Sequence, residues 1–121
     1  MRSTLKIGYR GRSIVLGDDA TAEETWSAMH PYIDMSGVDV LKASHHGRKS
    51  GYYQPAVKEM SPWLTITSVA NESEHDATES YRRYSDHTVS LRKVGDIRIT
   101  VEDDGTLRYS QNIEEHWRPK R

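Results

Sequence analysis

The sequence contains no cysteine. Disulfide bonds and cysteine-ligated zinc sites are therefore excluded. A metal site in this chain has to be built from its six histidines and from Asp and Glu side chains. Phenylalanine is also absent, so Trp and Tyr supply all of the aromatic bulk.

Long apolar runs are missing as well. No segment approaches the roughly 18 apolar residues that a membrane-spanning helix needs, and residues 1–6 lack the apolar region of a signal peptide. The 17 Lys and Arg residues balance 18 Asp and Glu residues, so no basic excess indicates a nucleic-acid-binding surface. These features predict a cytoplasmic protein without a membrane segment.

Apolar residues are scarce. They make up 35% of the chain, against about 45–50% in typical globular proteins. The 121 residues are enough for one domain, which we place at 1–121, with 111–121 as a tail. Because the core of such a domain would be thin, we expect a partner chain or a second copy to help bury apolar surface.

The patterns that are present alternate between strand and helix. Alternation at 5–9, an Arg10-Gly11 turn and an apolar run at 13–16 predict a β-hairpin. Strand–helix units follow. The first is a helix from Thr21 that Pro31 ends or kinks, followed by a strand at 38–41 and a helix around 53–60. A strand at 63–69 and a helix from Asp76 to Tyr84, with Asp76 and Glu79 as its capping residues, complete the series. Asp104-Gly105 predicts a closing hairpin between 97–101 and 107–109. This order predicts an α/β (α+β) fold, a mixed sheet with helices packed on at least one face.

Two predicted strands run directly into residues of the kinds that bind metals. One leads into Gly17-Asp18-Asp19 and the other into Ser44-His45-His46-Gly47. Since the ends of neighbouring strands meet at one edge of a sheet, a carboxylate and an imidazole from these segments could reach the same ion. Each segment also has a plainer interpretation. Gly-Asp-Asp is typical of a turn with a helix cap, and His-His-Gly of a solvated loop.

The two segments together resemble a known family. Residues 14–18, a following helix and then the string Asp-Val-Leu-Lys-Ala-Ser-His-His-Gly at 39–47 are similar to the second half of ComEC-like metallo-β-lactamase domains. In that family a hydrophobic strand ends in Gly-Asp, a helix follows, and Asp-Val-Leu-Lys precedes His-His-Gly-Ser. The resemblance extends from about residue 3 to about residue 110. It implies a partial domain, the C-terminal half of an αββα sandwich.

The resemblance implies roles for four residues. Asp18 matches the aspartate that bridges two metals and takes part in catalysis. His45 matches a late histidine ligand of the second metal, and His46 either supports that ligand or takes its place. His75 lies where the family often has a His-Pro pair and is expected to line the catalytic site. The implied cofactor is zinc or manganese, with two ions in the complete site.

Three departures from the family pattern matter. Arg48 stands where the family usually has Ser, and His75 lacks a following proline. The His-x-His-x-Asp-His string that supplies most ligands of the first metal is absent from these residues. We expect His30, His87 and His116 to be surface or packing residues that do not replace it. Because each zinc takes about four ligands, metal binding by this chain alone should be weak or absent.

The resemblance therefore implies a portion of a metal-dependent hydrolase of the nuclease or phosphodiesterase type, inactive or very weakly active without an N-terminal half. Its substrate would be a nucleic acid or another phosphodiester. The expected partner is that half, or a second copy of the chain, because half of the sandwich would leave an apolar sheet face in water. One alternative is a non-catalytic module that binds proteins. Another is an ordinary α/β domain whose polar segments are only loops.

Overall fold

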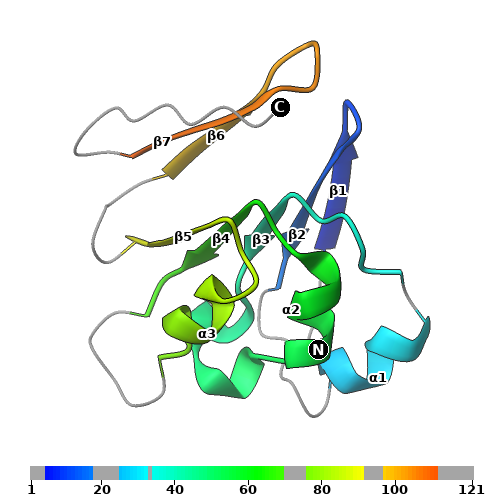
Figure 1. The fold of residues 1–121 in the computed structure, drawn as a ribbon, viewed down its shortest axis with the longest axis vertical. Helices are drawn as coiled ribbons and strands as arrows, with labels where there is room; N and C mark the ends of the chain where they lie inside the picture. Colours follow the sequence, from blue (N-terminus) through cyan, green and yellow to red (C-terminus); the bar gives the residue numbers. More distant parts are fainter. Residues whose placement is uncertain (1–4, 18–24, 33, 70–75, 92–96, 112–121) are drawn as a thin grey trace.

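The computed structural model describes residues 5–17, 25–32, 34–69, 76–91 and 97–111. Its main element is a five-stranded sheet in the order β1-β2-β3-β4-β5 (Figure 1). The strands are β1 (Leu5–Tyr9), β2 (Arg12–Leu16), β3 (Val40–Lys42), β4 (Leu64–Thr67) and β5 (His87–Ser90). β1 is antiparallel to β2, whereas β2, β3, β4 and β5 are parallel. The sheet is therefore mixed, with one antiparallel edge strand.

Each parallel step of the sheet is made through a helical crossover. The helices are α1 (Ser27–Met29), which continues into the 3₁₀ turn η2 (His30–Tyr32), then α2 (Gln54–Met60) and α3 (Thr78–Arg82). The strand order always advances in the same direction, and crossovers of this kind are right-handed. All three helices therefore lie on one face of the sheet, as Figure 1 shows.

An apolar core lies between the helices and the sheet. Val15 of β2 and Leu41 of β3 pack there against residues of α2, with Trp26 before α1. The Trp26 indole N–H donates to Ser44 Oγ at 2.9 Å, and the Ser44 hydroxyl donates to the Gly51 carbonyl at 2.9 Å. These bonds satisfy polar groups that burial would otherwise leave unpaired.

The opposite face of the sheet is covered by a two-stranded hairpin, β6 (Ile97–Val101) and β7 (Leu107–Gln111). Leu107 and Tyr109 of β7 belong to a second apolar cluster, whose members from the large sheet are Val40, Leu64, Ile66 and Val89. The Tyr109 ring also meets the Trp63 ring edge-on, with the centroids 5.6 Å apart. The chain thus forms three layers: helices, large sheet and hairpin.

The hairpin leaves part of the large sheet uncovered. In β2, Val15 packs toward the helices, so Ile14 and Leu16 point to the other face. The antiparallel register pairs Ile7 with Ile14 and Tyr9 with Arg12, which places both on that same face. Ile7, Tyr9 and Leu16 are 43%, 53% and 37% exposed. We call these three residues the open sheet patch.

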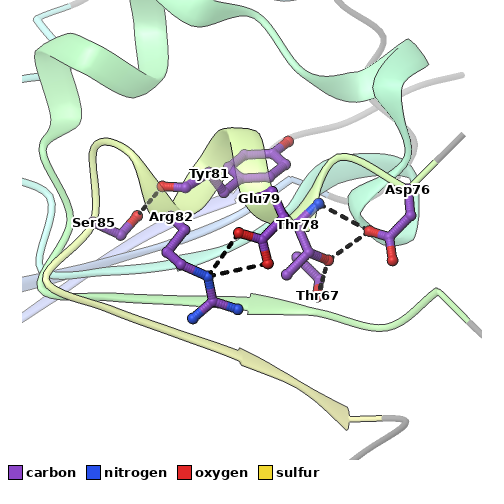
Figure 2. Close-up of polar contacts among 7 residues, drawn as sticks. All are labelled: Thr67, Asp76, Thr78, Glu79, Tyr81, Arg82 and Ser85. Carbon is purple, nitrogen blue, oxygen red and sulfur yellow. Dashed lines mark hydrogen bonds and ion pairs between the residues drawn. The ribbon is translucent and has the colours of Figure 1, made fainter.

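The start of α3 is held by side-chain hydrogen bonds to Thr78 (Figure 2). Asp76 Oδ1 accepts hydrogen bonds from the backbone N–H and the hydroxyl of Thr78. The Thr78 hydroxyl oxygen lies 2.9 Å from Thr67 Oγ1 at the end of β4. On the exposed side of the helix, Arg82 pairs with Glu79 at 3.3 Å. Asp76 therefore ties the first turn of α3 down, and the threonine pair ties α3 to the sheet.

The predicted fold class, a mixed sheet with helices packed on one face, is confirmed. Both hairpins occur where glycine turns predicted them, and Gly11 and Gly105 have positive φ values of 77° and 88°. Pro31 lies in the last helical turn before β3, as expected, whereas the predicted start of that helix at Thr21 lies outside the described residues. Among the described residues, no helix is long and apolar enough to cross a membrane.

Some boundaries differ from the sequence prediction. The strand expected at 38–41 is Val40–Lys42, and the strand expected at 63–69 is Leu64–Thr67. The helix expected from Asp76 to Tyr84 is Thr78–Arg82. The predicted cap by Asp76 and Glu79 is wrong, because Ala77 occupies the N-cap position without a side-chain cap bond. Asp76 instead accepts from the Thr78 N–H two residues on, and Glu79 pairs with Arg82. β5 (His87–Ser90) was not predicted, because its sequence lacks a clear apolar alternation and its pairing with β4 is a tertiary effect.

Candidate functional site

The carboxyl ends of β2, β3 and β4 lie next to one another at one edge of the sheet. The Gly17 N–H, just past β2, donates to the Lys42 carbonyl at the end of β3 at 3.0 Å. The Ala43 N–H in turn donates to the Ile66 carbonyl of β4 at 2.9 Å. Because parallel strands end in the same direction, the segments that follow them share this edge, where α/β sheets collect functional groups.

Gly17 and Ser44 approach each other very closely. A Cβ atom added to Gly17 would lie 2.6 Å from Ser44 Cβ and 2.7 Å from Ser44 N and Cα. Only glycine therefore fits at this position. In the sequence, Asp18 directly follows Gly17, and His45 directly follows Ser44.

Asp76 and Ala77 contact the same loop. Arg48 forms an isolated antiparallel bridge with Asp76, the residue after His75. The Ala77 N–H donates to the Gly47 carbonyl at 2.9 Å. The structure thus joins three neighbours of the predicted site residues, Gly17, Ser44 and Asp76, through the single loop 44–48.

The four predicted site residues are described to different extents. Asp18 and His75 lie outside the described residues. His45 belongs to the 3₁₀ turn η3 (Ser44–Gly47), but its side chain is outside the description. His46 is described in full, and its side chain is exposed. The roles assigned to Asp18, His45, His46 and His75 therefore stay predictions.

His46 is held in an unusual conformation at the end of the loop. Its φ of 60° lies in the left-handed region, which non-glycine residues seldom adopt. The Ser68 N–H donates to the His46 carbonyl at 2.8 Å, and His46 Nδ1 lies 3.3 Å from Ser68 Oγ. The contact through Nδ1 leaves Nε2 directed elsewhere. Histidines that bind a metal usually have their other ring nitrogen hydrogen-bonded, and the Ser68 contact is compatible with that arrangement.

Gly47 allows the loop to lie flat on β4. Its φ is 96°, and an added Cβ would lie 2.7 Å from Thr67 Cβ and Cγ2. Any side chain here would meet both backbone strain and a steric clash. The backbone conformation and the close packing against Thr67 therefore require glycine at position 47 of the His-His-Gly string.

Two polar residues to which no sequence pattern gave a role, Lys42 and Ser68, join His46 at this edge. Lys42 Nζ donates to Ser68 Oγ at 2.9 Å. The Lys42 side chain is half-buried, and this burial lowers the pKa of its ammonium group. Lys42 was visible in the Asp-Val-Leu-Lys string, but Ser68 lies 26 residues further along the chain. No local pattern could have joined the two.

The remaining described histidines have structural contacts. His30 Nε2 lies 2.9 Å from Glu59 Oε2, and its ring meets Tyr53 edge-on. The His87 ring packs against Trp63 and Tyr109. The prediction that these two histidines are surface or packing residues is confirmed. His116 lies outside the described residues.

The residues that the sequence pattern singled out fit a metal in chemical type. Carboxylate and imidazole groups from Asp18, His45, His46 and His75 are the donors that zinc prefers when cysteine is absent. In the part of the chain that the structure describes, no group of three or more His, Asp or Glu side chains is clustered. The described side chains therefore do not make up a metal site by themselves.

Comparison with protein-family models, with curated proteins and with solved structures gives no match for this chain.

Proposed function

We propose that this sheet edge is part of the active site of a metal-dependent hydrolase of the phosphodiesterase or nuclease type. The chain would be the C-terminal portion of a ComEC-like metallo-β-lactamase domain. One observation carries the proposal: loop 44–48 touches Gly17 on one side and Asp76 on the other. Residues next in sequence to Asp18, His45 and His75 therefore meet at one edge of the sheet.

In this proposal Asp18 and His45 bind the metal, with His46 as the alternative ligand, and His75 lines the reaction centre. Zinc or manganese, when bound, supplies the Lewis acidity that phosphodiester hydrolysis needs. Because each ion takes about four ligands, the missing ones come from an N-terminal half with the His-x-His-x-Asp-His string. The chain alone is then inactive or nearly so.

Metal titration of the whole chain tests the proposal. We expect weak but saturable binding of Zn²⁺ or Mn²⁺ by isothermal titration calorimetry. Asp18→Ala and His45→Ala should each weaken it about tenfold or more, since each removes one of few ligands. His30→Ala is the matched control, because His30 pairs with Glu59. Binding that survives Asp18→Ala unchanged would contradict the proposed site.

Activity gives the second measurement. Mixing the chain with an N-terminal half of a ComEC-like domain should produce metal-dependent hydrolysis of bis(p-nitrophenyl) phosphate. Asp18→Ala and His75→Ala should abolish this hydrolysis without changing the circular dichroism of the chain. Full activity in the Asp18→Ala mixture would show that Asp18 has no catalytic part.

We also propose that the partner, either that N-terminal half or a second copy of the chain, covers the open sheet patch. The side chains of Ile7, Tyr9 and Leu16 present apolar surface on the sheet face opposite the helices, and contiguous apolar surface of this kind marks interaction sites. A cytoplasmic location remains a prediction of the same proposal.

Light scattering of the chain alone checks the partner proposal. We expect self-association at micromolar concentration, and the double variant Ile7→Glu, Leu16→Glu should shift the chain toward monomer by placing charges in the apolar contact. Tyr32→Glu is the control, because Tyr32 is 87% exposed and lies in η2 on the helical side. A monodisperse wild-type monomer would contradict self-association.

A non-catalytic protein-binding module is the second candidate function. Two observations favour it: the His-x-His-x-Asp-His string is absent from these residues, and the open sheet patch offers a binding surface. Metal content after purification separates the two candidates, because a stoichiometric transition metal would argue against the module.

A further inference from the structure

Three polar side chains meet at the carboxyl ends of β3 and β4. Lys42 is the last residue of β3, Ser68 follows the end of β4, and His46 lies in η3. Ser68 Oγ is their common point, 2.9 Å from Lys42 Nζ and 3.3 Å from His46 Nδ1. In the parallel register Lys42 pairs with Ile66. Lys42 therefore lies on the sheet face away from the helices, beside the open sheet patch.

The cluster has more hydrogen-bond donors than acceptors. A lysine ammonium carries three N–H donors and no acceptor, and the contact with Ser68 uses one of them. When His46 Nδ1–H also donates to Ser68 Oγ, both lone pairs of that oxygen are filled and its own O–H is available as a donor. When His46 accepts instead, two Lys42 N–H groups are still available. In both tautomers the cluster suits an acceptor-only ligand, an anion.

The surroundings of Lys42 favour the same ligand. Its ammonium is partly removed from water, which is why its pKa is lowered. Among the described residues, the carboxylates in ion pairs are Asp103, Asp39, Glu59, Glu79 and Glu102, and none of them pairs with Lys42. A partly desolvated cation gains more from an anion than a fully hydrated surface lysine does.

We propose that Lys42, Ser68 and His46 form an oxyanion-binding site for a phosphoryl group. Lys42 supplies the charge, Ser68 supplies a hydroxyl donor, and His46 fixes the position of Ser68. The assignment of this group to a phosphodiester substrate rests on the proposed function above. The anion site itself requires no metal.

Titration of the whole chain in EDTA tests the site without any metal. Inorganic phosphate, methyl phosphate and dimethyl phosphate serve as probes, and the backbone amide shifts of Lys42, Ser68 and Gly47 serve as the readout in ¹H–¹⁵N spectra. We expect saturable shifts with at least one probe. Tighter binding of dimethyl phosphate supports a diester source, whereas tighter binding of the other two probes supports a monoester or free phosphate.

Two variants and one control locate the binding. Lys42→Met should weaken binding about tenfold or more, and Ser68→Ala about threefold, as expected for a charged and a neutral donor. Lys49→Met makes the same charge change on an exposed side chain of the neighbouring turn η4 (Lys49–Gly51) and should change binding less than about twofold. Lys42→Arg should keep part of the affinity, because it keeps the charge.

The outcomes separate this site from the metal proposal. Absence of saturable shifts overturns the anion site, as does equal weakening by Lys42→Met and Lys49→Met. Retention of phosphate binding by Asp18→Ala supports it, because the anion site works without metal. If the metal titration shows no binding but phosphate binding is retained and depends on Lys42, the hydrolase proposal is contradicted and the anion site is supported.

Discussion

Replacing Gly17 by alanine is expected to destabilise the chain by about 3 kcal/mol, at the upper end of the usual cost of overpacking. The added methyl carbon would lie 2.6–2.7 Å from Ser44 Cβ, Cα and N. Two of these are backbone atoms, so no side-chain rotation relieves the contact. Either β2 or the loop 44–48 has to move, and urea unfolding followed by circular dichroism measures the loss.

Gly8→Ala is the matched control for this substitution. Gly8 lies in β1, and an added Cβ would find only the Arg12 carbonyl oxygen at 3.9 Å, an ordinary contact. Alanine there is expected to be neutral or to stabilise by about 0.5–1 kcal/mol, because glycine loses more backbone freedom on folding. Equal stability of the Gly17→Ala and Gly8→Ala variants would show that β2 and loop 44–48 are not in contact.

Gly17→Ala also reports on the candidate site. The substitution changes no candidate metal ligand, but it separates the segments that lead to Asp18 and His45. If the proposed site exists, metal affinity should fall in this variant even at temperatures where it is still folded. The close approach of Gly17 and Ser44 is therefore both a packing feature and the geometric basis of the proposed function.

The sequence predicted the local parts of this fold well, because these depend on short-range rules. The first hairpin follows from alternation at 5–9 and a glycine at the turn, and the second from Asp104-Gly105. Asp104 accepts a hydrogen bond from the Thr106 N–H at 2.9 Å, the turn contact that such aspartates typically make. Neighbouring residues determine both turns.

β5 could not be predicted by the same rules. Its sequence, His-Thr-Val-Ser, has one aliphatic side chain, and Thr88 is nevertheless buried. The strand exists because β4 offers a free parallel edge, and because His87 packs against Trp63 and Tyr109. Tertiary pairing here overrides a weak intrinsic preference.

The candidate site, like the fold, could be predicted from the sequence only in part. The strings around Asp18 and His45 were recognised from the sequence, since each follows an apolar strand. Ser68 was not, because its neighbours Lys42 and His46 lie 26 and 22 residues away along the chain. Contacts between the ends of parallel strands depend on the strand order, which the sequence pattern did not determine.

The β6–β7 hairpin is expected to depend on a single leucine. Leu107, the first residue of β7, is fully buried against the large sheet. Leu107→Ala should cost about 3 kcal/mol, within the range of buried leucine truncations, because it removes apolar contacts and leaves a cavity. For a chain of this size the melting temperature should fall by roughly 10 °C or more.

Leu16→Ala is the matched control for Leu107→Ala, measured at a protein concentration low enough to suppress association. Leu16 lies on the same sheet face but is 37% exposed and outside the hairpin contact, so its truncation should cost less than about 1 kcal/mol. Arg12 also holds the hairpin, donating from Nε to the Gly105 carbonyl at 2.6 Å. That polar contact lies at the hairpin turn and does not replace the buried leucine. Equal losses for the two leucine variants would therefore mean that the hairpin does not pack on the sheet, and the sheet face beside Lys42 would then be far more open than the three-layer fold implies.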